Sequence, residues 1–482
     1  MNYVGTARPI HDAKGKATGY TKYAGDLSLP NMAYLCMLHS KIPHGYVKAV
    51  HAEKALALPG VYGVYHCLNT SDRKYNRYRS NFDQSYLPNE ECAFNDYVRF
   101  VGDKIGVVAA CDQETAERAA RLVEVEYEEL PFSIGFDDTL AGKNCLEGET
   151  PVRDEYTLEV GKKQESTEGL IEVCSTMELP RLHHATMETH ACIADYDPYS
   201  DMLTVYCPNQ AVHGIRTVLA DFLEMPESHV RVVKATMGGS FGAKQEWFLE
   251  PVTALVAKKL CRPVKLVYSR GEAMTDTIVR GAMRMSARGY YTPDGEMKEI
   301  YCDVTLDAGA YIGNAGDYVR ALAGKPTRCY RIPYMHYHGQ VISSNSPVSG
   351  AFRSWSAAEE ALMMERQLDA AAEKLGMDRL AIRLKNVARS GEEDKKLHLS
   401  LEDIRIGDAI TLGSEKFGWD KLKAEDAAFN ASQQRYRRGV GIGIGGHGNT
   451  YFPRFNDYGE GSISLNADGS MQANFTLHDH GC

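Results

Sequence analysis

The 482-residue sequence lacks clustered cysteines, since none of its 12 cysteines forms a Cys-x-x-Cys pair. Iron–sulfur clusters and structural zinc sites need clustered thiolates, so we expect neither on this chain. No uninterrupted apolar run is long enough to span a bilayer. The first residues carry no basic segment followed by an apolar run, and we therefore expect no signal peptide and a cytoplasmic protein.

Basic charge is also scarce. The formal net charge is −10 and there is no long basic run, which argues against nucleic acid or an anionic membrane as the main partner. No internal repeat of solenoid or propeller length is present. The 44% hydrophobic content is ample for a core, and the length predicts two to four domains.

Local patterns predict a mixture of strands and helices. Strands are expected at 33–38, 61–65 and 105–110, and helices at 46–58, 113–122, 357–375 and 378–387. Residues 141–175 are polar and contain glycine, so they are interpreted as a linker. The run from Gly309 to Arg320 is rich in glycine, which predicts a segment poor in helix.

A glycine-rich stretch from Met237 to Glu246 lies between an expected strand at 230–234 and an expected helix at 247–260. A turn at such a place offers backbone N–H groups and the positive end of a helix dipole to a ligand. It is not a Walker A loop, because Lys244 is followed by Gln245, and no Gly-x-Gly-x-x-Gly occurs here. The alternative is an ordinary tight turn.

Several polar residues occupy positions typical of ligand sites. Gln210 falls where a strand ends and a helix starts, and its amide can donate and accept at once, although a capping role is equally open. Arg320 could bind an anionic or carbonyl-bearing ligand with two N–H groups, or form a surface ion pair. Three histidines, at 183, 184 and 190, match no helical zinc motif, so a structural or pocket-wall role is favoured.

Several segments together resemble the molybdenum-binding subunit of the xanthine dehydrogenase family, the molybdenum hydroxylases. The similar segments are 4–9, 16–26, 55–61, 101–105, the loop 237–245 and Ala351-Phe352-Arg353, and the resemblance runs over essentially the whole chain. It implies an α+β fold, with an α/β hammerhead domain at 1–140, a linker at 141–175, and the first molybdopterin-binding domain at 176–482.

The resemblance also implies roles for individual residues. Gln210 and Phe241 would form the second shell of the molybdenum, close to its oxo ligand. The residues expected to bind the cofactor are Gln210, Gly239, Phe241, Gly242 and Arg353. Those expected to bind substrate are Gln245, Arg320 and Trp355; Gln245 stands where animal xanthine enzymes have glutamate, and Trp355 where phenylalanine is frequent.

One feature of the family is missing. The Gly-Glu-Pro-Pro segment that carries the catalytic glutamate does not occur in the sequence. The resemblance therefore implies no catalytic base on this chain, with the base glutamate on a partner chain that bears the second half of the molybdopterin-binding region. Nicotinate dehydrogenase, a relative within the family, has a split of this kind.

The implied activity is oxidation of an N-heterocycle, such as the purine xanthine or nicotinate, with water as the oxygen source. The implied cofactor is a molybdenum–pterin, with the cytosine dinucleotide form as one candidate, and 2Fe-2S and FAD would lie on partner subunits. Two alternatives remain: an aldehyde oxidoreductase of the same family, or a non-catalytic scaffold that lacks the catalytic half.

Overall fold

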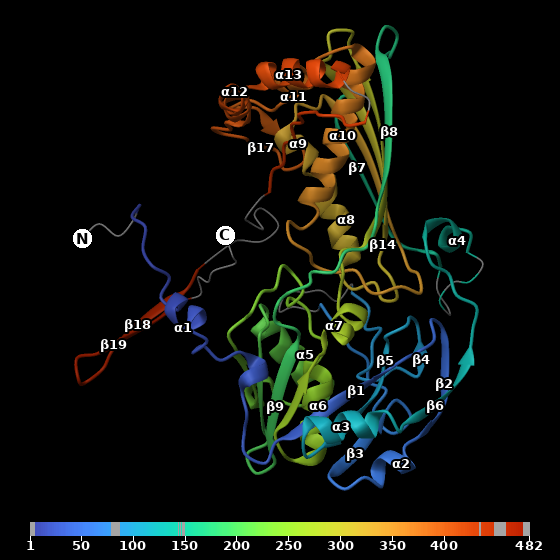
Figure 1. Cartoon of the computed structure of the whole chain (residues 1–482), viewed down its shortest axis with the longest axis vertical. Coiled ribbons are helices and arrows are strands. Elements are labelled where there is room, and N and C mark those ends of the chain that lie inside the picture. The colour runs from blue at the N-terminus through green and yellow to red at the C-terminus, as the bar shows by residue number, and fades with distance from the viewer. Residues whose placement is uncertain are drawn as a thin grey trace.

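The computed structural model describes residues 5–78, 87–142, 144, 146, 150–432, 435–447 and 459–475. Their strands form a seven-stranded sheet, a five-stranded sheet, a three-stranded sheet and two hairpins (Figure 1). Helices pack on the larger sheets, which confirms the predicted α+β class. Among the described residues, no helix is both long and apolar enough to cross a membrane.

The seven-stranded sheet joins the N-terminal segment to the segment that carries the glycine-rich loop. Its order is β11 (Val230–Lys234), β10 (Met202–Cys207), β9 (Ala191–Asp197), β12 (Val264–Val267), β1 (Ala33–His39), β5 (Lys104–Ala110) and β3 (Val61–His66). The connection is a parallel pair, in which Ala33 lies opposite Val264 and Leu35 opposite Leu266. Three strands from the first 140 residues therefore extend a sheet that residues 191–267 also build.

A three-stranded sheet lies beside it, in the order β4 (Tyr97–Val98), β2 (Gly45–His51) and β6 (Glu124–Glu129). The helix predicted at 46–58 is wrong for most of its length, because β2 pairs with β6 and only Glu53–Leu56 is helical, as α2. Helix α3 (Gln113–Ala120) is confirmed, and its N-cap is Asp112, whose carboxylate accepts from Thr115 N. A short α4 spans Phe136–Leu140.

The five-stranded sheet has the order β7 (Val152–Gly161), β15 (Tyr334–Ile342), β14 (Met297–Asp307), β13 (Ala282–Tyr291) and β8 (Ile171–Leu179). The interpretation of 141–175 as a linker is corrected here, since β7 and the start of β8 lie within it. Both are edge strands with alternating exposed side chains, which explains their polar composition. The β14–β15 pair is parallel, and the other three pairs of this sheet are antiparallel.

Helices cover both large sheets. Helices α5 (Val212–Leu223) and α6 (Glu250–Leu260) pack on the seven-stranded sheet, and α7 (Arg270–Asp276) follows β12. On the five-stranded sheet lie α8 (Ala315–Ala323) and α10 (Ala357–Leu375), with α9 (Pro326–Cys329) and α11 (Arg379–Asn386) beside α10. Helix α8 contradicts the helix-poor expectation for 309–320: Ala315, Val319 and Leu322 form a buried face that outweighs the nearby glycines.

The remaining elements are short or peripheral: α1 (Ala13–Ala17), the 3₁₀ turns Ala24–Asp26 and Glu227–His229, the hairpin β16 (Glu393–Asp394) and β17 (Leu399–Ser400), α12 (Ile406–Phe417), α13 (Trp419–Ser432), and the hairpin β18 (Gly461–Leu465) and β19 (Met471–Phe475). Two large apolar cores lie at the two main sheets, and Trp355 packs against both. The segment that precedes α10 thus lies where the two halves of the molecule meet.

Candidate functional site

The glycine-rich loop forms a compact turn rather than the start of a helix. Gly239, Phe241 and Gly242 have left-handed backbone, with φ of 101°, 54° and 103°. Helix α6 begins only at Glu250, so the expectation that the loop leads directly into a helix is wrong. Local hydrogen bonds replace helical ones, since Ala243 N donates to Ser240 O (2.9 Å) and Gln245 N to Gly242 O (3.3 Å).

Gln210 lies against this loop, at the end of β10 and one residue before the N-cap of α5. Its backbone N–H donates to the carbonyl of Lys244 at 2.8 Å, and its side-chain Oε1 accepts from the hydroxyl of Ser240 at 2.8 Å. The same hydroxyl oxygen accepts from Lys244 N at 3.1 Å. The hydroxyl of Ser240, which a glycine would lack, therefore fixes both the loop and the Gln210 amide.

The glycine-rich loop crosses the loop 350–356 at Gly242. A Cβ on Gly242 would lie 2.4 Å from the carbonyl oxygen of Ala351, so glycine alone permits this approach. Next to the crossing, Arg353 N donates to Phe241 O at 2.8 Å. The structure thus brings Phe241, Gly242 and Arg353 together from segments more than a hundred residues apart.

Arg280 fixes the loop 350–356 through contacts with Phe352 and Arg353. Its guanidinium donates to the carbonyl of Arg353 at 2.9 Å, pairs with the buried Glu359 at 2.5 Å, and lies 4.2 Å from the centroid of the Phe352 ring. Tyr318 also donates to Glu359, at 3.0 Å. This clamp uses a cation, a carboxylate and an aromatic face to fix the backbone of Arg353, which leaves the Arg353 side chain exposed.

Two buried histidines fix the carbonyls on either side of the crossing. His184 Nε2 lies 2.8 Å from Ala351 O, and His190 Nε2 lies 2.9 Å from Ala243 O. Burial lowers the pKa of each to about 4, so both are neutral near pH 7 and donate through Nε2. Both Nδ1 atoms are buried with no partner among the described residues. The third histidine, His183, contacts Thr277 instead.

Glu188 links Gly238, near the start of the glycine-rich loop, to Lys244, near its end. Lys244 Nζ lies 2.6 Å from Glu188 Oε2, and the same oxygen accepts from Gly238 N at 2.7 Å. The lysine side chain is buried, and that burial lowers its pKa while the Glu188 charge opposes the shift. A charge-assisted contact of this kind fixes Gly238 and Lys244 relative to each other.

Glu246 connects the loop to the N-terminal segment. Its side chain is buried, with Oε1 3.4 Å from the backbone nitrogen of Ala351, and its own carbonyl accepts from Asn209 Nδ2 at 2.7 Å. Burial raises the pKa of Glu246 to about 8, and the charge of Arg77 opposes that rise. Glu246 therefore touches both site loops and faces a cation contributed by residues before 140.

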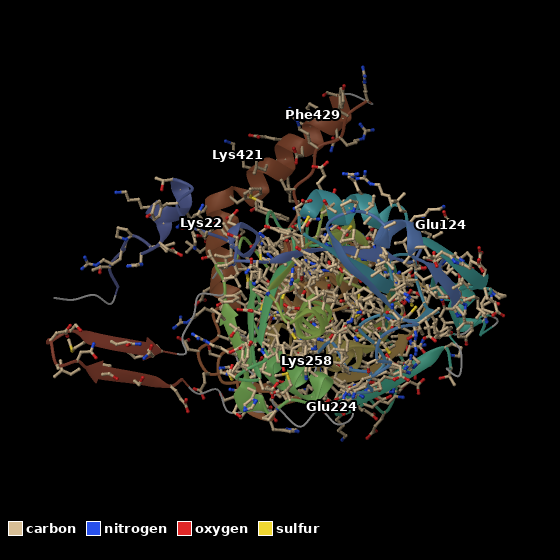
Figure 2. All side chains as sticks on the ribbon, turned by 90° about the horizontal axis from the view of Figure 1, so that it is seen from below. Lys22, Glu124, Glu224, Lys258, Lys421 and Phe429 are labelled. Carbon is tan, nitrogen blue, oxygen red and sulfur yellow. The ribbon has the colours of Figure 1, made fainter. Side chains whose placement is uncertain are left out.

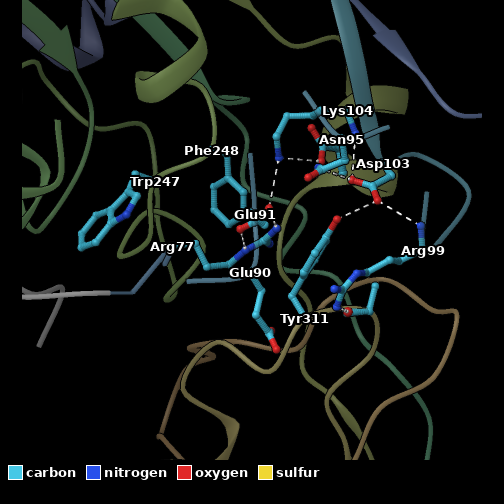
Figure 3. A network of polar contacts seen from close by, with 12 residues as sticks. Arg77, Glu90, Glu91, Asn95, Arg99, Asp103, Lys104, Trp247, Phe248 and Tyr311 are labelled. Carbon is cyan, nitrogen blue, oxygen red and sulfur yellow. Dashed lines mark hydrogen bonds and ion pairs between the residues drawn. The ribbon is translucent and has the colours of Figure 1, made fainter. Parts of the chain in front are cut away.

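Behind Glu246 lies a buried polar network, shown in Figure 3. Arg77 Nε donates to Glu91 at 2.6 Å, and its guanidinium lies 4.9 Å from the centroid of the Phe248 ring. Lys104 Nζ lies 3.5 Å from Glu91 and 3.4 Å from Asp276. This network braces residues 246–248 from the side of the N-terminal segment, so the loop is supported by both halves of the seven-stranded sheet.

Trp355 lies in a strained turn, because Ser354, Trp355 and Ser356 have φ of 76°, 40° and 66°. Its ring centroid is 5.1 Å from that of Tyr318 and 6.4 Å from that of Tyr78. Lys325 Nζ donates to its backbone carbonyl. Three consecutive left-handed residues persist only where the surroundings hold them, and here the lysine and the two tyrosines do so.

The other two residues expected to bind substrate differ in their placement. Gln245 belongs to the glycine-rich loop, is half-buried, and has a side chain with no hydrogen-bond partner among the described residues. Arg320, on α8, donates to both oxygens of Asp154 on β7, at 2.6 and 2.8 Å. The guanidinium of Arg320 is thus engaged by a carboxylate of the five-stranded sheet rather than by the two site loops.

The site retains unused donors. The backbone N–H groups of Gly239, Ser240 and Phe241 donate to no acceptor among the described residues, and the Arg353 guanidinium has no partner there either. Phe241 is 50% exposed. Consecutive free N–H groups in a left-handed turn beside an arginine suit an anionic or oxo-bearing ligand, so the residues present fit the expected cofactor.

Three of the supporting residues were not singled out from sequence: Glu188, Glu246 and Arg280. Glu246 is the last residue of the glycine-rich stretch, but whether a charged residue at the end of a loop faces the core depends on tertiary contacts. No sequence signal marked the other two.

Three family models match the chain. A model for the a/b hammerhead domain of aldehyde oxidase and xanthine dehydrogenase matches residues 18–131, and models for molybdopterin cofactor-binding domains match 149–387 and 412–482. The nicotinate dehydrogenase large molybdopterin subunit of Eubacterium barkeri is 31% identical over 384 residues, which cover 79% of this chain and 88% of that protein. The chain belongs to the xanthine dehydrogenase family of molybdenum hydroxylases.

Other members of this family agree. The xanthine dehydrogenase molybdenum-binding subunit of Escherichia coli O157:H7 is 29% identical over 95% of the chain. The fold matches that of the aldehyde oxidoreductase from Desulfovibrio desulfuricans ATCC 27774, with a TM-score of 0.86, 22% identity, and coverage of 97% of this chain and 52% of that one. The hammerhead domain followed by a molybdopterin-binding domain is thereby confirmed, as is membership in an oxidoreductase family that binds molybdopterin.

The chain spans 61% of the length of the Escherichia coli xanthine dehydrogenase subunit. The third model begins at residue 412, so the segment 176–482, expected to belong to the first cofactor domain alone, also contains a match to a second one.

Proposed function

We propose that this chain is the molybdenum-cofactor subunit of a cytoplasmic hydroxylase that oxidises an N-heterocyclic substrate, a purine such as xanthine or nicotinate, with water as the oxygen source. The observation that supports it is the crossing of the two loops at Gly242. There, Gln210, Phe241 and Arg353 converge with three free backbone donors.

The chain's own residues would bind and orient the cofactor and the substrate. The free N–H groups of Gly239 and Phe241 would hold the oxygen-bearing side of the cofactor, and the Gln210 amide, fixed by Ser240, would donate to it. The exposed Arg353 would bind the pterin side through its guanidinium fork. When bound, the molybdenum–pterin supplies the redox chemistry.

Substrate would lie over the exposed face of Phe241, with Gln245 as a neutral hydrogen-bonding group. Trp355 and Arg320 belong to this proposal as substrate contacts, and Arg320 would have to share its guanidinium with Asp154. The base glutamate would come from a partner chain that carries the rest of the second molybdopterin-binding domain. Iron–sulfur and FAD subunits would carry electrons away.

The test is native purification of the complex, with mass spectrometry of co-eluting chains and molybdenum analysis. We expect stoichiometric molybdenum, a partner that bears a Gly-Glu-Pro-Pro segment, and dye reduction with xanthine or nicotinate. Dye reduction with aldehydes alone would replace the substrate class with that of the aldehyde oxidoreductases. A chain that elutes alone and without metal would contradict the catalytic role and favour a scaffold.

A further inference from the structure

A buried lysine and a buried glutamate lie beside the turn that carries Trp355. Lys325 is the N-cap residue of α9 and is 9% exposed, and its Nζ donates to the carbonyl of Trp355. Glu360 belongs to the first turn of α10, directly after the Trp355 turn, and is 1% exposed. Helices α8 and α9 both contact α10 (Figure 1), so both charges and the turn belong to one buried region.

The carboxylate of Glu360 lacks hydrogen bonds, because neither of its oxygens has a partner among the described residues. A buried carboxylate of this kind is costly unless a nearby cation compensates it. Burial raises the pKa of Glu360 to about 8, and the charge of Lys325 is the strongest influence that opposes this rise. Burial likewise lowers the pKa of Lys325 to about 8, and the charge of Glu360 opposes that shift most strongly. The two residues therefore compensate each other.

The other charged groups near this pair have partners of their own. Glu359 pairs with Arg280, and Arg328 pairs with Asp394 at 2.9 Å. The remaining titratable groups that face the pair are Glu365, which pairs with Arg383, and Lys396 and His447. Within the described part of the chain, the lysine and the glutamate are thus each other's principal counter-charge.

The backbone of the Trp355 turn is strained, since residues 354–356 are all left-handed and none of them is glycine. Two of its hydrogen bonds are local, from Trp355 N to Phe352 O at 2.9 Å and from Ala357 N to Ser354 O at 3.0 Å. The bond from Lys325 comes instead from a segment thirty residues earlier in the chain. It therefore ties the turn to the fold of α8 and α9.

We propose that Lys325 is a positioning residue for Trp355, and that Glu360 holds the lysine in place as its counter-charge. The inference rests on the proposed function at one point, the role of Trp355 as a substrate contact. Without the bond from Lys325, the turn relaxes from its left-handed backbone and the indole ring leaves Tyr318. The ring then no longer offers a fixed face on which a heterocycle can stack.

Tryptophan fluorescence of the full chain tests the positioning step. The chain has three tryptophans, of which Trp247 and Trp419 are only 2 and 6% exposed. Trp355 is half-buried, so it is the tryptophan most open to a soluble quencher such as acrylamide. We expect Lys325→Met to shift the quenchable emission to longer wavelength and to increase its quenching. Trp355→Phe should remove this component, which assigns the signal.

The matched control is Lys258→Met on α6, labelled in Figure 2. Lys258 is also half-buried and donates to a carbonyl, that of Leu223 at 3.1 Å, but it lies on the seven-stranded sheet. Its emission and quenching should equal those of the wild type.

A second variant, Lys325→Met with Glu360→Gln, separates positioning from folding, because it removes both buried charges together. This double variant should fold and still show the shift, since the donor to the Trp355 carbonyl is missing. Wild-type emission and quenching in the folded double variant would overturn the inference.

Steady-state kinetics of the native complex, with xanthine or nicotinate as substrate, provide a second readout. We expect the double variant to raise KM by about tenfold, the scale of one lost aromatic stacking contact, with kcat and molybdenum content near those of the wild type. A shifted emission with unchanged KM would support the positioning of Trp355 and remove Trp355 from the substrate contacts. A complex without molybdenum or turnover would contradict the proposed function, while the emission would still decide this inference.

Discussion

The carbonyl oxygen of Ala351 lies 2.4 Å from the position that a β-carbon on Gly242 would occupy, so the two loops of the site touch through backbone alone. His184 and Arg280 hold one loop at this crossing, and His190 and Lys244 hold the other. The position of Phe241 thus depends on contacts from several parts of the chain.

Gly242→Ala should separate the loops. The new methyl group would clash with the backbone of Ala351, and the φ of 103° at position 242 is unfavourable for alanine. We therefore expect a loss of stability of about 3 kcal/mol and little retained molybdenum. The control is Gly413→Ala on α12, where a Cβ meets nothing within 4 Å. This variant should keep the stability and the molybdenum content of the wild type. Molybdenum per chain and urea denaturation are the measurements; wild-type values for Gly242→Ala would contradict the crossing.

Arg353→Ala should weaken retention of the cofactor roughly tenfold, because a hydrogen bond to a charged group contributes about 1.5–3 kcal/mol. Arg366→Ala removes an exposed arginine from α10 and should have no effect. Pterin release during gel filtration measures the difference. Equal release from both variants would remove Arg353 from the site.

Acid should destabilise the protein through His184 and His190. Their pKa values are about 4 in the folded chain against 6.5 unfolded, so the unfolded chain binds more protons between these values. Their stabilisation is complete above about pH 6.5 and falls as the pH drops toward 4, by at most about 3 kcal/mol for each histidine. The double variant His184→Gln with His190→Gln should flatten this part of the stability curve, whereas His398→Gln, on the surface, should not.

Glu246 should have the opposite dependence. Its folded pKa of about 8 exceeds the ordinary 4.5, so its stabilisation is complete below pH 4.5 and is lost as the pH rises through 8. Relative to Glu246→Gln, the wild type should lose on the order of 2–4 kcal/mol between pH 5 and 8. Exposed Glu415→Gln is the control. Parallel stability curves for the wild type and Glu246→Gln would show that the carboxyl is ionised throughout.

Arg320 and Asp154 should be coupled by less than about 1 kcal/mol, because both side chains are partly exposed. A double-mutant cycle with Arg320→Gln and Asp154→Asn measures this coupling. If Arg320 also orients substrate, Arg320→Gln should lower kcat/KM with molybdenum content unchanged, and Asp154→Asn should leave kcat/KM nearly unaltered. Equal losses in both variants would mark a purely structural pair.

The sequence predicted those elements whose pattern is set locally. Helix α10 repeats buried residues at helical spacing, and β5 is a short run of buried apolar residues. The strand β2 was missed because its pairing with β6 is a tertiary contact, and β7 was missed because an edge strand with an exposed face has the composition of a loop.

For the candidate site, the family resemblance named residues that lie near one another in the structure, and their roles in binding cofactor or substrate stay predictions. Gln210, Phe241 and Arg353 were named from it and are close together in the structure. The residues that hold them could not be found in this way. His190 and Glu246 act through single contacts to backbone groups, and nothing in the sequence specifies which backbone group a buried side chain will meet.

The parallel pair of β1 and β12 has a consequence for synthesis of the chain. Strand β1 leaves the ribosome more than two hundred residues before the strand against which it must lie. Until β12 is made, β1, β3 and β5 can form only a partial sheet, in which the edge of β1 has no partner strand. Non-local pairing of this kind is slow to form. Folding of this chain should therefore depend on assistance during translation, and late release from a chaperone would be its expected signature.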